Sequence, residues 1–124
     1  MAGQTRRNRG ARAHLSGAAA EDSVVRHYAQ SGRTVAARRW RGEGGEIDLV
    51  ARDGDGLIFV EVKRARNLAD AARRLTEAQM ARIVGAASEY LGGMPLGQLT
   101  PVRFDLALVD GNGRVEVIEN AFGA

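Results

Sequence analysis

Two acidic residues, Asp48 and Glu61, lie on neighbouring segments that are predicted to pair as a hairpin. Residues 46–51 and 57–64 have the strong apolar patterning of strands, and polar and apolar side chains alternate over residues 46–49 and 60–63. The sequence Asp53-Gly54-Asp55-Gly56 between them is a dense turn signal. If a two-residue turn closes the antiparallel pair, Asp48 lies directly opposite Glu61.

The expected pairing sorts the hairpin into a polar and an apolar face, because side chains alternate between the two faces of a strand. The polar face carries Glu46, Asp48, Glu61 and Lys63, with Glu46 opposite Lys63. The apolar face carries Ile47, Leu49, Val60 and Val62, which a helix would cover. A slip of one residue in register would destroy this arrangement.

The opposition of Asp48 and Glu61 suggests a metal site, since two carboxylates facing each other on a sheet repel. Mg²⁺ or Mn²⁺ would relieve the repulsion, because hard cations take carboxylate and carbonyl oxygens and keep several waters. Such a cation polarises a phosphoryl group and lowers the pKa of a bound water. Lys63 would orient that water, help to remove its proton or offset charge on the phosphorus. The alternative is a solvated charged face with a Glu46–Lys63 ion pair, worth about 0–1 kcal/mol.

The rest of the chain predicts the elements that would position this hairpin. Thr76 and Gln79 fit the capping box of a helix, which Gly92-Gly93 would end. The expected elements besides the hairpin are a helix over 15–30, a strand over 34–40, a helix over 76–91 and a final hairpin of 102–109 with 114–119. Their order, α-β-β-β-α-β-β, predicts an α/β fold with a mixed central β-sheet flanked by helices.

Length and composition point to one folded domain without covalent staples. The chain has 124 residues, and we expect a single domain over residues 15–124 after a disordered basic tail over residues 1–14. It contains no cysteine, which excludes disulfides and thiolate metal sites and suits a cytoplasmic location. No apolar run is long enough to cross a membrane, so no membrane partner is expected.

The net charge of +3 is unevenly distributed along the chain. Arg6, Arg7, Arg9 and Arg12 crowd the first dozen residues, which contain no acid. One interpretation is a solvated tail. The other is an arm that contacts the phosphates of a nucleic acid.

The hairpin residues also resemble a known family. Asp48, twelve intervening residues and then Glu61-Val62-Lys63 resemble the PD-(D/E)XK nuclease motif, with Ile47 in place of the proline. The strings Gly45 to Arg52, Phe59 to Lys63 and Val102 to Asp105 are more closely similar to the uncharacterised YraN-like family within that superfamily. The similarity covers roughly residues 15–110, and it implies a restriction-endonuclease-like core.

The resemblance implies roles for individual residues. Asp48 and Glu61 correspond to the metal-binding carboxylates, the main-chain carbonyl of Val62 to a further ligand and Lys63 to the catalytic lysine. Glu21 matches a glutamate of the first helix that often points into such sites, although it could equally be a solvated helix acid.

Other polar residues near the motif have weaker assignments. Gln79 is either the polar residue that related nucleases carry on the helix after the motif or simply the capping-box partner. Glu46 would be a peripheral acid or a partner of Lys63. Arg38, Arg39 and Arg41 either guide a phosphodiester backbone or form a solvated strand end.

Several remaining residues are expected to have structural roles. His27 is interpreted as a surface or boundary residue, Trp40 as partly buried core, and Asp105 as a partner of an arginine. His14 falls in or next to the tail. The glycines of 42–45 are not a P-loop, because no Gly-Lys-Ser/Thr follows them.

The sequence therefore predicts a metal-dependent nuclease acting on nucleic acid, with DNA as the expected substrate and a homodimer as a possible state. Two alternatives stay open. The first is a nucleic-acid-binding module that keeps the site without cleaving, in a repair, recombination or uptake assembly. The second is a protein-interaction domain that uses a sheet edge or the helix over 76–91.

Overall fold

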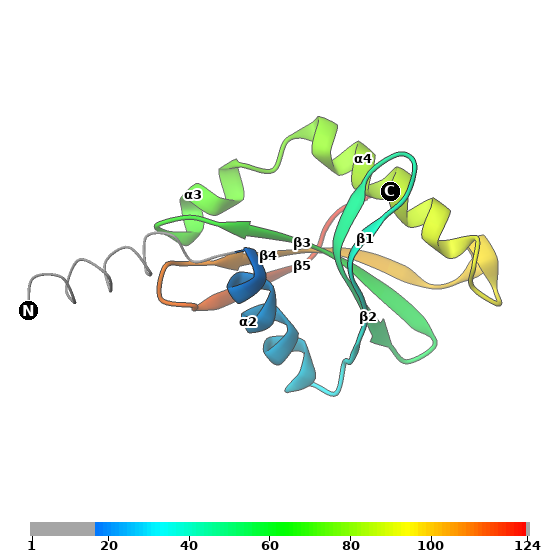
Figure 1. Ribbon diagram of the computed structural model, residues 1–124, viewed down its shortest axis with the longest axis horizontal. Helices are drawn as coiled ribbons and strands as arrows, with labels where there is room; N and C mark the ends of the chain where they lie inside the picture. The colour runs from blue at the N-terminus through cyan, green and yellow to red at the C-terminus, as the bar shows by residue number, and fades with distance from the viewer. Residues whose placement is uncertain (1–16, 124) are drawn as a thin grey trace, which may run out of the picture.

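The computed structural model describes residues 17–123, apart from the side chain of Leu68 (Figure 1). The predicted tail over residues 1–14 lies outside the described residues. The elements, in chain order, are α2 (Gly17–Ala29), β1 (Val35–Arg41), β2 (Glu46–Asp53), β3 (Gly56–Arg64), α3 (Leu68–Arg73), α4 (Glu77–Leu91), the 3-10 turn η1 (Gly97–Leu99), β4 (Val102–Val109) and β5 (Val115–Phe122).

The strands form one five-stranded sheet in the order β1-β2-β3-β4-β5. β3 and β4 are parallel, and every other neighbouring pair is antiparallel. The parallel pair needs a crossover connection, which α3 and α4 supply. The α/β fold with a mixed central sheet flanked by helices is thus confirmed.

Helices cover both faces of the sheet, with α2 on one side and α4 on the other (Figure 1). α2 presents Ala20, Val24 and Tyr28 to a buried cluster that includes Leu49 and Val60 of the sheet. The cluster beneath α4 combines four residues of that helix with six of the strands: Ile83, Ala86, Ala87, Leu91, Ile47, Val50, Leu57, Phe59, Phe104 and Phe122. No helix within residues 17–123 has the length and apolar character needed to span a membrane.

The start of α4 follows the predicted capping box. The Thr76 side chain accepts a hydrogen bond from the Gln79 N–H, and the Gln79 side chain accepts one from the Thr76 N–H. The short helix α3 was not predicted. Its N-cap Asn67 accepts a hydrogen bond from the Asp70 N–H at 2.8 Å, so Asn-x-x-Asp was the local signal available.

The hairpin of β2 and β3 has the predicted register. The pairs run from Asp53↔Gly56 at the turn to Leu49↔Val60. Gly54 has φ 58 at the first central position of the turn, a conformation that glycine adopts without steric cost. The expectation that Ile47 and Leu49 share a face is wrong. Ile47 packs under α4 and Leu49 packs under α2. The regular alternation of β2 side chains between the two faces of the sheet is therefore interrupted between these two residues.

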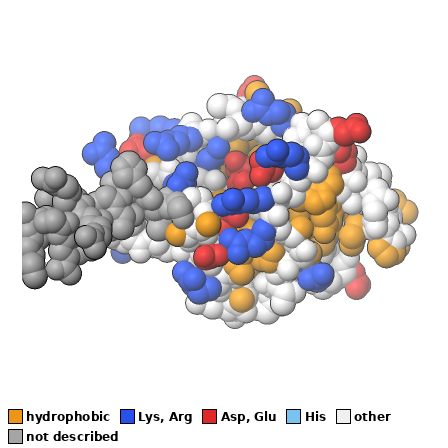
Figure 2. Space-filling model, in the orientation of Figure 1, with side chains coloured by type: hydrophobic (Ala, Val, Ile, Leu, Met, Phe, Trp, Pro, Cys, Tyr) orange, Lys and Arg blue, Asp and Glu red, His pale blue; other side chains and the backbone are white. Residues whose placement is uncertain are grey.

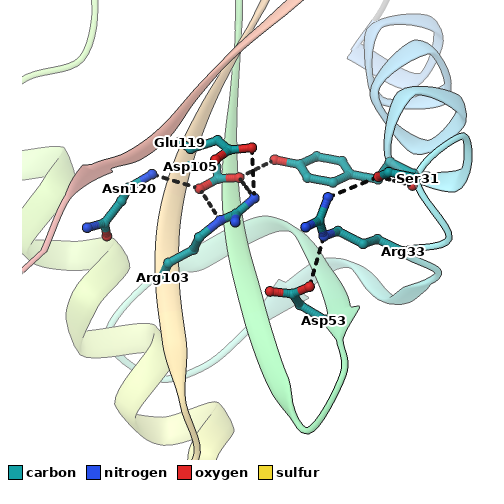
Figure 3. A network of polar contacts seen from close by, with 8 residues as sticks. Ser31, Arg33, Asp53, Arg103, Asp105, Glu119 and Asn120 are labelled. Carbon is teal, nitrogen blue, oxygen red and sulfur yellow. Dashed lines mark hydrogen bonds and ion pairs between the residues drawn. The ribbon is translucent and has the colours of Figure 1, made fainter.

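A buried polar network joins α2 to β4 and β5 (Figure 3). Asp105 is fully buried and accepts hydrogen bonds from the Tyr28 hydroxyl at 2.7 Å and the Asn120 N–H at 2.9 Å. The Arg103 guanidinium forms an ion pair with Asp105 at 3.0 Å. Burial, and then the bond to Asp105, raise the pKa of the Tyr28 hydroxyl far above its ordinary value. The predicted arginine partner of Asp105 is therefore confirmed, and the network is structural.

Candidate active site

Asp48 lies where β2 and β3 separate. The two strands pair up to Leu49↔Val60. Beyond that point, a hydrogen bond to the Asp48 side chain takes the place of backbone hydrogen bonds between the strands. Its Oδ2 accepts a hydrogen bond from the Val62 N–H at 2.8 Å. The hairpin therefore brings Asp48 next to the Glu61-Val62-Lys63 strand, as the register predicted, through a side-chain contact instead of a regular strand pair.

Glu61 and Lys63 lie together on β3. The Lys63 Nζ is 3.3 Å from the Glu61 Oε1, and their side chains are 13% and 15% exposed. The expected partnership of Glu46 with Lys63 is not formed among the described residues. Glu46 instead pairs with Arg41 at 3.5 Å, because β2 diverges from β3 beyond Leu49 and stays paired with β1.

The two carboxylates of this site resist ionisation. Burial, followed by the negative charge of Asp48, raises the pKa of Glu61 to about 7, although Lys63 opposes the shift. Burial also raises the pKa of Asp48, against the hydrogen bond from the Val62 N–H. At neutral pH, the Glu61 carboxyl is therefore partly protonated, and a nearby cation would favour the ionised form of both acids.

Glu21 reaches the same region from α2, and two arginines of β1 hold it. The Arg39 Nε donates to both Glu21 oxygens, at 3.2 and 3.0 Å, and the Arg38 Nη2 lies 3.6 Å from Glu21 Oε1. Arg38 also pairs with Asp22 at 2.8 Å. The Glu21 side chain is only 8% exposed, and its charge contributes to the raised pKa of Asp48. The structure thus brings Glu21 toward the predicted site, already paired with arginine.

Arg39 has an unusual backbone. Its φ of 49 lies in the left-handed region, which costs a residue other than glycine about 1–2 kcal/mol. It occupies the position between the pairs Arg38↔Leu49 and Trp40↔Ile47, and so lies opposite Asp48 of β2. A strained backbone therefore lies beside the acidic site, and such strain is concentrated at functional sites in proteins.

The other predicted residues take more ordinary places. Gln79 serves the capping box, as its alternative interpretation held. Arg41 is 78% exposed at the end of β1. Trp40 packs against the α4 cluster with its ring edge-on to Tyr90, which confirms it as partly buried core. His27 is exposed, as expected for a surface residue.

Sequence reasoning missed the residue that fastens the loop between β1 and β2. The Glu89 carboxylate of α4 accepts hydrogen bonds from the N–H groups of Glu43 and Gly44, both at 2.8 Å. A Cβ at Gly42 would meet the Glu89 carboxylate and the Trp40 ring, so a larger residue there would force these side chains to shift. The glycine-rich loop was visible in the sequence, but its partner lies about 45 residues further along the chain.

The donor atoms suit a hard divalent cation. Asp48 and Glu61 offer carboxylate oxygens whose mutual repulsion a cation would relieve, and Mg²⁺ is commonly held by one or two carboxylates plus waters. Within residues 17–123, no three acidic or histidine side chains already converge as a metal-binding group. The nearby Glu21 carboxylate is instead paired with Arg38 and Arg39.

Basic side chains surround this acidic centre. Figure 2 shows acidic side chains near the middle of the view with Lys and Arg side chains around them, over the region between α2, α3 and β1 in Figure 1. The exposed arginines on or next to α2, β1, β3 and α3 include Arg26, Arg38, Arg39, Arg41, Arg64, Arg66, Arg73 and Arg74. Such a rim has the charge needed to approach a phosphate backbone.

Comparison with known proteins gives a consistent match. Residues 20–109 match the model of the "Uncharacterised protein family UPF0102", a span that includes all of the acidic residues and the lysine described above. A UPF0102 protein of Cereibacter sphaeroides (strain ATCC 17025 / ATH 2.4.3) is 61% identical over 111 residues, covering 90% of this chain and 95% of the relative. A UPF0102 protein of Ruegeria pomeroyi is 58% identical over 116 residues, covering 94% of each.

Proposed function

This chain belongs to the UPF0102 (YraN-like) family, and from that premise we propose that it is a metal-dependent nuclease that hydrolyses phosphodiester bonds in nucleic acid, with DNA as the expected substrate. The observation that carries the proposal is the meeting of Asp48, Glu61 and Lys63 where two strands of the sheet separate. The resemblance to PD-(D/E)XK nucleases, carried by the same three residues, supports it.

The arrangement is costly for stability and therefore favours a role in chemistry. Two acids that share a mostly buried position and have raised pKa values destabilise the fold when both are ionised. Perturbed acids beside a lysine are common where chemistry is done. A purely structural site would more simply resemble the Tyr28–Asp105 network, in which a single buried carboxylate is paired with a guanidinium and accepts from a hydroxyl and an N–H.

Each residue has a proposed task. Asp48, Glu61 and the Val62 carbonyl would hold Mg²⁺ or Mn²⁺, and Glu21 is a further candidate ligand. The cation supplies a polarised phosphoryl group and a water of lowered pKa. Lys63, whose Nζ is 3.3 Å from Glu61, would orient that water or offset charge that develops on the phosphate.

The surrounding arginines define the proposed substrate class. Exposed arginines lie on β1, at the ends of β3 and α3 and in the loops that follow them, and basic side chains lie around acidic ones on the face in Figure 2. Arg38, Arg39 and Arg41 would contact backbone phosphates on one side of the scissile bond, with Glu46 modulating Arg41. The absence of cysteine suits a reducing cytoplasm, where we place the protein.

A cleavage assay tests the proposal directly. Linear duplex, single-stranded and branched DNA, with matched RNA, would be incubated with Mg²⁺ or Mn²⁺ and with wild type, Asp48→Ala or Lys63→Ala. We expect cation-dependent cleavage by wild type and a loss of at least about 100-fold in both variants. Glu116→Gln, an exposed substitution on β5, is the matched control and should cleave normally.

The same experiment separates the alternatives. Binding without cleavage by wild type, at any cation concentration, would favour the non-catalytic nucleic-acid-binding module. Neither binding nor cleavage would favour the protein-interaction domain. If both strands of duplex DNA are cut in one binding event, two copies of this single-site chain act together at the substrate. Sedimentation of the DNA complex would then show a homodimer.

A further inference from the structure

The ion pair of Arg39 with Glu21 differs from an ordinary surface ion pair, because Glu21 is nearly buried and Arg39 has a positive φ. Apart from glycines, only Arg39 and Asn120 have positive φ among residues 17–123. A left-handed residue inside a strand persists only where the surroundings hold it there. The contact that holds Arg39 in this conformation is with Glu21, because both oxygens of the Glu21 carboxylate accept hydrogen bonds from the Arg39 Nε.

The left-handed turn at Arg39 places two successive arginines on one side of the sheet. Ala37 and Trp40 both pack against the α4 cluster, although residues three apart in a regular strand face opposite ways. Between them, Arg38 and Arg39 both reach Glu21 on the α2 side. The irregularity therefore serves to bring a second guanidinium to one carboxylate.

This contact withholds Glu21 from the other two acids. Glu21 is nearly buried, and Arg39 lies opposite Asp48 on the neighbouring strand, so both charges lie at the edge of the site. In the described chain, no three acidic side chains form a cation-binding group, and the Glu21 carboxylate is directed to the arginines. If the Arg39 guanidinium were released, Glu21 would keep only its ion pair with Arg38, which is longer at 3.6 Å and therefore weaker.

We propose that Arg39 is a phosphate-released latch, a side chain that holds Glu21 away from Asp48 and Glu61 until a phosphodiester of the substrate takes the guanidinium. The inference rests on the proposed function. It deepens it by making completion of the acidic site depend on bound nucleic acid.

The exposure of the two partners supports this direction of exchange. The Arg39 side chain is 54% exposed, whereas the Glu21 side chain is 8% exposed. A phosphate can therefore reach the Arg39 guanidinium from solvent without any other side chain moving first. Phosphate also suits a guanidinium better than the present contact, since it can accept two parallel N–H bonds while Glu21 engages only the Nε.

The latch predicts opposite effects of one substitution on two ligands. Mn²⁺ binding would be titrated without nucleic acid, and binding of a DNA oligonucleotide would be measured in EDTA. We expect Arg39→Gln to bind Mn²⁺ about 3- to 10-fold more tightly than wild type and to bind the oligonucleotide several-fold more weakly. Arg39→Gly, which suits a positive φ, should behave in the same way if the glutamine variant folds poorly.

Two controls isolate the contact with Glu21. Arg33→Gln removes an arginine that pairs with Asp53 instead, and it should leave Mn²⁺ affinity within about twofold of wild type. In a Glu21→Gln background, Arg39→Gln should no longer tighten Mn²⁺ binding, because no carboxylate remains to be released.

The outcomes separate the latch from the nuclease proposal. If wild type binds Mn²⁺ in an Asp48-dependent manner and Arg39→Gln does not tighten it, the latch is wrong and the metal site stands. A gain that persists with Glu21→Gln also overturns the latch. If neither wild type nor Arg39→Gln binds Mn²⁺, both proposals fail.

Discussion

At the scale of single residues, the acid pair determines how the protein responds to pH. The pKa of Glu61 is raised to about 7 by burial and by Asp48, and the pKa of Asp48 is raised by burial. In the unfolded chain both would titrate near their ordinary values. The folded chain therefore binds more protons between pH 4.5 and 7, and its stability falls as pH rises through that interval.

Replacing Glu61 with glutamine should remove most of this dependence. Wild type should lose about 2–3 kcal/mol of unfolding free energy between pH 4.5 and 8, while Glu61→Gln should change much less and be the more stable protein at pH 8. Urea unfolding across that range, without divalent cations, measures the effect. Glu116→Gln, at an exposed position, should follow wild type. An equally steep decline in Glu61→Gln would show that the perturbed acid is not Glu61.

At the scale of elements, Asp105 is the residue through which one helix and two strands are joined. It binds Tyr28 of α2, Arg103 of its own strand β4 and the Asn120 N–H of β5 (Figure 3). Asn120 takes a positive φ of 49 where the register of β4 and β5 shifts, so the carboxylate also supports an irregular edge strand. A buried charge of this kind stabilises only while all of its partners are present.

Asp105→Ala should therefore be strongly destabilising. We expect a loss of about 3–5 kcal/mol, because the Arg103 charge and the Tyr28 hydroxyl would lose their buried partner. Asp53→Ala removes the Arg33–Asp53 pair, whose side chains are 29% and 41% exposed, and should cost about 0–1 kcal/mol. Thermal unfolding of the two variants makes the comparison. Similar losses in both would contradict the structural role given to the Asp105 network.

At the scale of the whole molecule, the distribution of charge matters more than its sum. Basic side chains surround an acidic centre on the face shown in Figure 2. Gly17, the first described residue, lies against the same region, since a Cβ there would be 3.5 Å from the Arg39 Nη2. The arginine-rich residues 6–12 are therefore joined to the described part of the chain beside the candidate site.

This position predicts that the N-terminal arginines contact the same nucleic acid. Each phosphate contact contributes about −0.9 to the slope of log affinity against log salt on duplex DNA. Replacing Arg6, Arg7, Arg9 and Arg12 with glutamine should make that slope shallower by about 2–4 if most of them bind phosphates. Binding in EDTA over a salt series measures the slope. Arg33→Gln, near the hairpin turn, should not alter it, and an unchanged slope in the fourfold variant would leave the segment as a solvated tail.

Local patterns were sufficient to predict most of the fold. Alternation of polar and apolar residues, together with Asp53-Gly54-Asp55-Gly56, fixed the β2–β3 register, and Thr76 with Gln79 fixed the start of α4. β4 was predicted at its observed bounds of Val102–Val109. These features depend on contacts between residues near in sequence or joined by one short turn. α3 was overlooked because it is only six residues long, too short to show a helical period of apolar side chains.

The sequence by itself determined which residues of the candidate site meet on one hairpin, since a two-residue turn fixes where Asp48 lies relative to Glu61-Val62-Lys63. Only the tertiary structure decided what each of them contacts. Glu46 forms an ion pair with Arg41, and Glu21 forms ion pairs with Arg38 and Arg39. Glu89 accepts a hydrogen bond from a loop about 45 residues earlier in the chain. The physical reason is that strand divergence, a left-handed φ at Arg39 and the packing of α2 and α4 depend on contacts distant in sequence, which no local pattern encodes.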